Sequence, residues 1–334
     1  MTPALLVHRL FTPALLEELG TLVDLDPADV LTDPATAPAA RARLAEAEVL
    51  IAGWGAPKIS PADAPNLRAV VYLGGVAATC LTDLAGWSAR GLVAANTRAA
   101  NAVPVAEYAL AMILLSGKHA FDIEQDFRRR RTLPEHHTGG DGPGNHGRTI
   151  GIVGVSATAR VLIEYLCLHD ISVVAHDPYL DASQARTLGI ELTTLDEVMA
   201  RGDVVSLHQA LTPETTGQIG AEQLALMADG ATLLNTARGA VVDTDALTAE
   251  LRTGRIRAIL DVTDPEPLPP DHELWTLPGV VLTPHLAGSL GGELHRMGRA
   301  AVDEVRRFTA GEPFAHPEHL PASDEGTAAA TGTK

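Results

Sequence analysis

Arg238, Glu266 and His285 are the residues of this chain best suited to chemistry, because each follows a short apolar run that is typical of a β-strand. A guanidinium binds a carboxylate through two parallel hydrogen bonds. An imidazole transfers one proton near neutral pH, and a carboxylate beside it fixes its tautomer and favours its charged form. These three groups are what the interconversion of a 2-hydroxy acid and a 2-keto acid requires.

The elements that must position these residues alternate between strands and helices, which predicts an α/β fold with two Rossmann-like or flavodoxin-like parallel-sheet domains. Apolar runs predict strands at residues 49–52, 69–72, 92–95, 150–155, 171–175, 204–207, 232–234, 256–260 and 280–282. Helical periodicity is found at residues 13–19, 41–47, 83–90, 103–117 and 291–308.

The order of these elements predicts a discontinuous substrate domain, built from residues 1–98 and 288–313. Residues 99–287 form the second, Rossmann domain in this prediction. Residues 314–334 lack an apolar period and are expected to be a flexible tail.

A dinucleotide fingerprint is expected where the run from Ile150 to Arg160 ends a strand and opens a helix. Gly154 supplies the tight turn, and Ala159 replaces the last glycine of the pattern. Asp177 follows the next strand, where a carboxylate can accept hydrogen bonds from an adenosine ribose and repels a 2′-phosphate. These residues predict NAD rather than NADP as the cofactor.

Ser156 is the departure from this fingerprint, because it occupies the place of the second glycine. Its bulk can hold the pyrophosphate away from the helix, or its hydroxyl can donate a hydrogen bond to a phosphate oxygen. We favour the first effect, because Ala157 and Ala159 add no donors. Ala157 and Thr158 open the helix and belong to the same predicted cofactor site.

Composition excludes some classes of function. The net charge of −17 argues against a nucleic-acid partner. No uninterrupted apolar run reaches about 18 residues and no secretory signal is found, so we expect a cytoplasmic protein without a membrane span. Cys80 and Cys167 lie in apolar surroundings and are expected to be buried thiols.

Two clusters are open to alternatives. The basic run from Arg128 to Arg131 is interpreted as a solvated helix end, and the alternative is attraction of an anionic ligand. His136, His137 and His146 lie in a Gly- and Pro-rich segment, and we expect a solvated loop and no metal site, because no Cys or carboxylate pattern accompanies them.

Taken together, the motifs resemble those of the D-isomer-specific 2-hydroxyacid dehydrogenase family, from about residue 45 to about residue 310. The similarity is carried by these ordered segments: Asn101-Ala102 with Val105-Ala106-Glu107, Ser206-Leu207-His208 with Leu211 to Thr215, Ala237-Arg238-Gly239 with Val241-Val242-Asp243, Asp261-Val262 with Glu266-Pro267, and Thr283-Pro284-His285 with Ala287-Gly288.

The resemblance implies roles for further residues. His208 lines the adenosine side of the cofactor, Thr236 and Ala237 flank the nicotinamide, and Asp261 holds its carboxamide, with a structural role of Asp261 as the alternative. A homodimer acting on a small 2-hydroxy or 2-keto acid is also implied.

The family further implies that backbone N–H groups of Gly74 and Gly75 bind the substrate carboxylate, and Trp54 lines the same pocket or simply packs. The family pattern continues Gly-Val-Asp-x-x-Asp, whereas Ala77 and Cys80 occupy the two Asp positions here. The substrate side chain is therefore left open.

Two other activities within the resemblance are disfavoured. The acid at Glu266 differs from the amide of formate dehydrogenases, and Gly74 stands where phosphite dehydrogenase has a lysine. The alternative from another class is a non-catalytic, NAD-sensing regulator or corepressor-like protein on the same fold.

Overall fold

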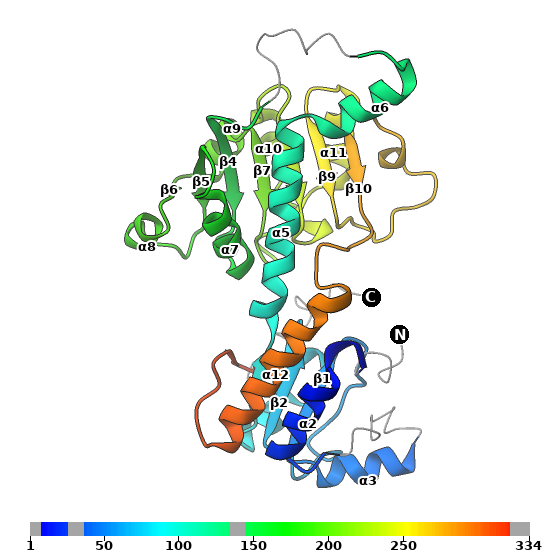
Figure 1. Ribbon diagram of the computed structural model, residues 1–334, viewed down its shortest axis with the longest axis vertical. Coiled ribbons are helices and arrows are strands. Elements are labelled where there is room, and N and C mark those ends of the chain that lie inside the picture. Colours follow the sequence, from blue (N-terminus) through cyan, green and yellow to red (C-terminus); the bar gives the residue numbers. More distant parts are fainter. Residues whose placement is uncertain (1–7, 26–36, 134–143, 321–334) are drawn as a thin grey trace. The chain divides into compact units, whose positions relative to one another are not determined.

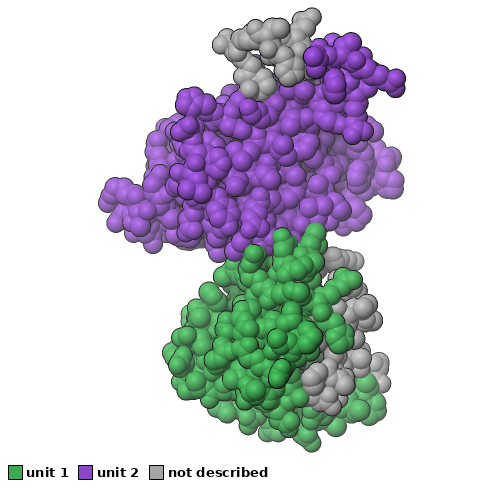
Figure 2. All heavy atoms as spheres, in the orientation of Figure 1, with its two compact units in different colours: residues 1–101, 289–334 green, residues 102–288 purple. Residues whose placement is uncertain are grey.

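The computed structural model describes residues 8–25, 37–133 and 144–320. The chain divides into unit 1, residues 1–101 and 289–334, and unit 2, residues 102–288 (Figure 2). Unit 1 is thus made from both ends of the chain. From the sequence, the borders between the units were expected after residues 98 and 287.

Unit 2 is built on a seven-stranded parallel sheet with the order β10-β9-β8-β7-β4-β5-β6 (Figure 1). Its strands are β4 (Arg148–Val153), β5 (Ile171–His176), β6 (Glu191–Leu192), β7 (Val204–Leu207), β8 (Thr232–Asn235), β9 (Arg257–Leu260) and β10 (Val280–Leu282). The strand order reverses between β4 and β7, and ligands of such sheets bind beyond the carboxyl ends of the strands at that point.

Helices cover both faces of this sheet, as the two separate core clusters show. The helices of unit 2 are α5 (Arg98–Gly117, which begins in unit 1), α6 (Ala120–Arg130), α7 (Ala157–Leu166), α8 (Ala182–Thr187), α9 (Leu195–Arg201), α10 (Ala221–Leu226) and α11 (Thr244–Arg252), with 3-10 turns η3 (Gly239–Val241) and η4 (Glu273–Trp275). Apolar residues of α9, α10 and α11 fill one cluster, and those of α5, α7 and α8 fill the other. Buried parallel strands need such cover on both sides.

Helix α5 is, among the described helices, the one long and apolar enough to cross a membrane by length and composition. No such segment is expected from the sequence, because the helix has no uninterrupted apolar run of about 18 residues. In the structure Ala106, Ala109 and Ile113 are buried in one cluster with Ile150 and Ile152 of β4. A core helix meets the same length and composition test, and α5 has one face buried in this cluster.

Unit 1 is built on a four-stranded sheet with the order β1-β2-β3-β11. Its elements are β1 (Val49–Gly53), β2 (Ala69–Leu73), β3 (Val93–Asn96), β11 (Pro317–Glu318), α2 (Pro13–Leu22), α3 (Pro38–Glu46), α4 (Leu84–Ala89), α12 (Leu294–Thr309), and the 3-10 turns η1 (Ala77–Cys80) and η5 (Gly291–Glu293). Strands β1, β2 and β3 are parallel, and β11 joins β3 antiparallel. The predicted α/β fold with two mainly parallel sheets is confirmed.

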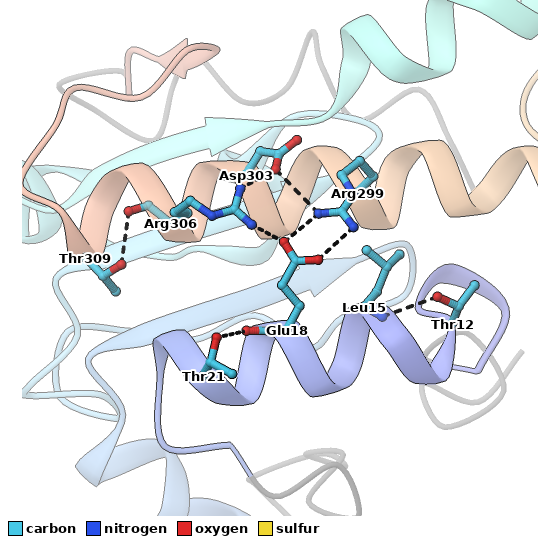
Figure 3. Close-up of polar contacts among 8 residues, drawn as sticks. All are labelled: Thr12, Leu15, Glu18, Thr21, Arg299, Asp303, Arg306 and Thr309. Carbon is cyan, nitrogen blue, oxygen red and sulfur yellow. Dashed lines mark hydrogen bonds and ion pairs between the residues drawn. The ribbon is translucent and has the colours of Figure 1, made fainter.

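Helix α12 returns the chain to unit 1 and lies beside α2 (Figure 3). Its buried face includes Met297, Ala301 and Val305. On the exposed side, Arg299 donates to both oxygens of Glu18, at 2.6 and 2.7 Å, and Arg306 also donates to Glu18. The hydrogen bond from Arg299 lowers the pKa of the Glu18 carboxyl. An ion-pair network therefore joins the two ends of the chain.

The structure corrects two expectations outside the site. Residues 317–318 form β11 where a flexible tail was expected, because their backbone pairs with Ala94 and Ala95 of β3; residues 321–334 lie outside the described part. Cys167 is exposed, since it follows the end of α7, whereas Cys80 is buried as expected.

The two clusters left open by the sequence are partly described. Arg128, Arg129 and Arg130 pair with Glu124 and Asp126 of the same helix, as a solvated helix end would. His136 and His137 lie outside the described residues, and His146 is exposed beside Asp170, with 3.4 Å between the paired atoms.

Candidate active site

The three residues of the triad, by which we mean Arg238, Glu266 and His285, follow three neighbouring strands of unit 2. Strands β8, β9 and β10 are adjacent and parallel, so their carboxyl ends share one edge of the sheet. Arg238 follows β8, Glu266 follows β9 and His285 follows β10. The sheet order thus brings together residues that are far apart in sequence.

The turn that carries Arg238 is fixed by Asn235, the last residue of β8. The buried Asn235 amide accepts from the Ala237 N–H at 3.0 Å and donates to the Arg238 carbonyl at 2.9 Å. At Gly239 an added Cβ would lie 2.0 Å from the backbone of Thr263, so only glycine lets this turn approach the segment that leads to Glu266.

The guanidinium of Arg238 donates to the Ala237 carbonyl at 2.6 Å. Burial of part of the side chain lowers the pKa of Arg238, and the charge of the Glu266 carboxylate opposes this shift. An arginine remains charged despite such a shift. The side chain as a whole remains accessible to solvent, and a ligand can therefore reach it.

His285 and Glu266 form a direct pair, with 2.7 Å between Nδ1 and Oε1. Their side chains are 39% and 41% exposed, so the pair is open to a ligand. His285 has a left-handed backbone with φ of 52°, and its N–H donates to the carbonyls of Asp261 and Thr283 at 2.9 and 3.0 Å. These bonds hold the ring against Glu266.

Asp261 holds the segment around His285 through its carboxylate, and the residue is 2% exposed. Oδ1 accepts from the Thr283 hydroxyl at 2.6 Å and the Leu286 N–H at 2.9 Å, and Oδ2 accepts from the Ala287 N–H at 3.0 Å. Because the Thr283 hydroxyl donates to Asp261, the Tyr108 hydroxyl donates to Thr283, at 2.8 Å. These contacts support the structural role that was the alternative for Asp261.

The expected cofactor residues of the fingerprint lie beyond the carboxyl ends of β4 and β5, beside the switch point of the sheet. Gly154 has φ of 83°, and a Cβ there would lie 2.6 Å from the Gln209 backbone that follows β7. Ser156 caps α7, where its hydroxyl accepts from the Ala159 N–H at 3.4 Å. Asp177 reaches back to this turn, because Oδ2 accepts from the Val155 N–H at 2.6 Å.

Two polar atoms near these turns are buried and have no hydrogen-bond partner among the described residues, namely Oγ1 of Thr236 and Oε1 of Gln209. A buried polar atom without a partner is costly, and a bound ligand can supply the missing donor. Gln209 follows β7, which borders the switch point, and Thr236 follows β8, the next strand of the sheet. They are therefore suited to a polar ligand at this edge of the sheet.

His208 lies deeper than expected for a residue that lines a cofactor. The residue is 6% exposed, and its Nε2 lies 2.8 Å from the Ser206 hydroxyl. Burial lowers the pKa of the His208 imidazole to about 4, so it is neutral at physiological pH. Ala237 is also buried, whereas Ala157 is exposed and Thr158 half-buried in the first turn of α7.

Gly74 and Gly75, which were expected to bind the substrate carboxylate, lie in unit 1, in the turn after β2. The N–H of Gly74 donates to the Thr97 hydroxyl at 3.0 Å and is therefore engaged within unit 1, which differs from the expected contact with a substrate. Gly74 has φ of 100°, and the Trp54 ring lies where its Cβ would be, within 2.3 Å. Trp54 thus packs on this loop and is 42% exposed.

Within the described residues, no group of three or more His, Cys, Asp and Glu side chains is arranged to hold a metal ion.

Comparisons with known proteins agree on one family. Residues 110–287 match the NAD-binding domain of the D-isomer specific 2-hydroxyacid dehydrogenases. The (S)-sulfolactate dehydrogenase of Chromohalobacter salexigens is 35% identical over 255 residues, which are 73% of this chain and 78% of that protein. The chain belongs to the D-isomer specific 2-hydroxyacid dehydrogenase family. Unit 2 accordingly carries the NAD-binding domain of this family.

Other relatives of the family differ in length and substrate. D-3-phosphoglycerate dehydrogenase of Mycobacterium leprae is 34% identical over 252 residues, 75% of this chain and 47% of that protein. The chain thus spans about half the length of the phosphoglycerate dehydrogenases that it matches. Among solved structures, a phosphoglycerate oxidoreductase from Rhizobium etli has a TM-score of 0.78 and 26% identity, with 93% of this chain and 94% of that chain covered.

A further solved member is the apo form of Rhodotorula graminis D-mandelate dehydrogenase, with a TM-score of 0.76 and 26% identity, covering 92% of this chain and 93% of that chain.

Several residues that contact the candidate site residues were not predicted from the sequence. Gln209 and Asn235 are polar residues at or just after strand ends, a signal that could have found them. Tyr108 lies in an apolar helix and joins the Thr283–Asp261 network only through the fold. The same is true of Thr97, whose hydroxyl contacts the loop after β2.

Proposed function

We propose that this chain is an NAD-dependent oxidoreductase that interconverts a D-2-hydroxy acid and its 2-keto acid. The observation that carries the proposal is the His285–Glu266 pair, at 2.7 Å: these residues follow β10 and β9, and β9 lies next to β8, the strand that Arg238 follows. An acid–base group beside a carboxylate-binding guanidinium is what this reaction needs. Membership of a dehydrogenase family supports the same reaction.

The hydrogen bond to Glu266 assigns the two ring nitrogens of His285. An ionised carboxylate only accepts hydrogen bonds, so Nδ1 of His285 carries the shared proton. The other nitrogen, Nε2, is then the atom that gives a proton to the 2-keto oxygen during reduction. In the opposite direction, neutral His285 takes the hydroxyl proton at Nε2. Glu266 keeps the ring oriented through this hydrogen bond.

Arg238 is the proposed carboxylate ligand, and its charge also polarises the 2-keto group. In unit 1, the N–H of Gly75 is the second proposed ligand of the substrate carboxylate. Gly74 supports this loop instead of binding, because its own N–H bonds to Thr97. Trp54, which packs on Gly74, is proposed to contact the substrate side chain.

The residues at the switch point fit a dinucleotide. The first turn of α7 presents backbone N–H groups from which a pyrophosphate can accept hydrogen bonds. Ala157 and Thr158 begin this turn. The side-chain oxygens of Thr236 and Gln209, which have no partner among the described residues, offer hydrogen-bonding sites to the bound molecule. When bound, NAD supplies or accepts the hydride. Asp177 is proposed to favour NAD over NADP, since its carboxylate repels a 2′-phosphate.

Three further residues are proposed to contribute to the cofactor site, each on a different observation. Ala237 flanks the nicotinamide in this proposal, next to Thr236. Asp261 mainly holds the His285 segment, and contact with the carboxamide is its second proposed role. His208 shapes the adenosine side from within the core, because only 6% of its surface is exposed.

The family resemblance further supports a cytoplasmic homodimer that binds a small acid and neither nucleic acid nor membrane. Light scattering coupled to size-exclusion chromatography tests the assembly: twice the chain mass of 35.0 kDa is expected. A monomer at micromolar concentration would contradict the proposed dimer while leaving the reaction intact.

The test of the reaction is a screen of 2-keto acids that follows the absorbance of NADH. The panel contains glyoxylate, hydroxypyruvate, pyruvate, phenylpyruvate, and the keto acids that correspond to the named substrates of relatives, 3-phosphoglycerate, sulfolactate and mandelate. We expect turnover of at least one, with the D-hydroxy acid as product. Tight NADH binding without turnover of any would favour the NAD-sensing regulator instead.

A further inference from the structure

The turn η1, which continues the loop after β2, has no hydrogen-bonding cap of its own. Its N-cap residue is Val76, whose apolar side chain makes no capping bond. The first N–H groups of any helical turn lack partners within the turn and need an outside acceptor. Residues 74–80, here called the substrate loop, therefore depend on another part of the chain for this contact.

That acceptor is Glu318, which lies 241 residues further along the chain. Oε1 of Glu318 accepts from the N–H of Ala77, the first residue of η1, at 2.7 Å. A carboxylate is the preferred partner at this end of a helical turn, because the free N–H groups there carry partial positive charge. The contact holds the substrate loop just after Gly75.

The second oxygen of Glu318 is engaged as well. The Asn96 side-chain NH₂ donates to Oε2 at 2.8 Å, while the Asn96 side-chain oxygen accepts from the N–H of Arg98 at 3.1 Å. The Asn96 amide cannot flip without losing that second bond. Both carboxylate oxygens of Glu318 thus face fixed donors, and only a carboxylate satisfies the two together.

Backbone pairing puts Glu318 in this position. Strand β11 pairs antiparallel with β3, with Glu318 opposite Ala94, and the N–H of Asn96 donates to the His316 carbonyl at 3.2 Å. Leu320 packs against the core cluster that also contains Ala77 and Cys80. The C-terminal segment is therefore anchored on both sides of Glu318.

We infer that Glu318 is a positioning residue for substrate binding, which supplies from the C-terminal strand the carboxylate that the substrate loop lacks. The family pattern has acids in this loop, and here Ala77 and Cys80 take their places. The inference rests on the proposed function, because it assumes that the loop binds the 2-keto acid. Glu318 itself touches neither substrate nor cofactor in this account.

The central test is Glu318→Gln, which preserves size and one acceptor oxygen but turns an NH₂ group toward the NH₂ of Asn96. We expect the KM for the 2-keto acid to rise about tenfold, with kcat and the NADH Kd within twofold of the wild type. Glu312→Gln is the matched control, since Glu312 pairs with Arg307 on the surface of the same segment. This control should leave all three constants unchanged.

Exchanging the acid and the amide between positions 318 and 96 makes the test specific to the Glu318–Asn96 contact. Asn96→Asp alone places two carboxylates together and should raise KM at least as much as Glu318→Gln. The double variant, Asn96→Asp with Glu318→Gln, restores a donor opposite an acceptor, because the introduced amide donates to the introduced carboxylate and both of the other hydrogen bonds are retained. We expect its KM to return to within about threefold of the wild type, a coupling that unrelated damage would not produce.

Hydrogen exchange of the Ala77 amide separates this inference from the proposed function. Glu318→Ala, which removes the acceptor of the Ala77 N–H, should speed exchange at Ala77 at least tenfold, whether or not the protein turns over a 2-keto acid. Unchanged exchange would overturn the positioning role even in an inactive protein. An active enzyme whose KM is unchanged by Glu318→Gln would overturn the inference and leave the proposed function standing.

Discussion

In unit 2 the triad is held mainly by residues that follow adjacent strands of one sheet, whereas in unit 1 the substrate loop depends on a residue of the C-terminal strand β11 as well as on Thr97. Asn235 fixes the turn of Arg238 from three residues away, and Glu266 pairs with His285 from 19 residues away. The substrate loop relies on Thr97 and on Glu318, 23 and 241 residues from their partners.

This difference separates two kinds of substitution. Residues that follow strands β8, β9 and β10 should govern the chemical step, because they form the proton-transfer pair and its guanidinium neighbour. Residues that support the substrate loop should govern substrate affinity alone. The predictions for unit 2 follow from the largest expected effect to the smallest, and a matched pair of variants in the two units then tests the separation itself.

His285→Ala should have the largest effect, since it removes the proposed acid–base group. A positioned acid–base group contributes about a hundredfold to ten-thousandfold in rate, and kcat should fall by that amount. NADH affinity, measured by fluorescence titration, should not change. His146→Ala, at an exposed histidine of the same unit, is the control. Equal turnover of His285→Ala and wild type would remove His285 from the mechanism.

Arg238→Lys should lower kcat/KM by about tenfold to a hundredfold, because an ammonium cannot reproduce the two-pronged bond to a carboxylate, and a charge-assisted hydrogen bond contributes about 1.5–3 kcal/mol. Both kcat and KM should change in steady-state measurements. If both constants stayed within twofold of the wild type, Arg238 would be structural and the substrate carboxylate would bind elsewhere.

His208 should make unit 2 sensitive to acid. Its pKa in the folded protein is about 4, against 6.5 as the ordinary value, so the unfolded chain binds more protons between these pH values. The free energy of unfolding should therefore fall by about 2 kcal/mol between pH 7 and pH 5 on account of this group. Urea unfolding at both pH values measures it.

The matched variant His208→Gln lacks the titrating group and can still hydrogen-bond to Ser206. Its loss of stability between pH 7 and pH 5 should be smaller than that of the wild type by the same amount. Identical losses in the two proteins would show that the buried imidazole does not control the response to acid.

Ser156→Gly should have the smallest effect, a severalfold tighter binding of NADH with kcat nearly unchanged. Ser156 adds bulk where a glycine allows close approach to the pyrophosphate, and replacement of a serine cap by glycine costs only a few tenths of a kcal/mol. Calorimetric titration decides the sign. Weaker binding by the glycine variant would make the Ser156 hydroxyl a phosphate ligand.

The contrast between the two units also explains which features could be predicted from the sequence. Apolar runs predict the strands of both units, and the polar residues that follow β8, β9 and β10 predict that Arg238, Glu266 and His285 meet, because parallel strands place their carboxyl ends at one edge. Glu266 and His285 do meet in the structure.

Contacts across long stretches of sequence could not be predicted. β11 is two residues long, too short to show a strand pattern, and its Glu318 resembles any surface acid until β11 pairs with β3. Likewise, nothing around Gly74 in sequence indicates that its N–H is engaged by Thr97. Tyr108 belongs to the same class, since its hydroxyl meets Thr283 only through tertiary packing.

The most direct test of the separation between the units makes the same chemical change in each, Glu266→Gln and Glu318→Gln, and compares full Michaelis curves for the preferred 2-keto acid at saturating NADH. We predict that Glu266→Gln lowers kcat by about tenfold or more, since it removes the carboxylate that pairs with Nδ1 of His285 and orients the ring, and leaves KM within about threefold. Glu318→Gln should raise KM and leave kcat within twofold. If both variants altered the same constant, or if Glu266→Gln kept the kcat of the wild type, the assignment of chemistry to unit 2 and of substrate positioning to unit 1 would be wrong.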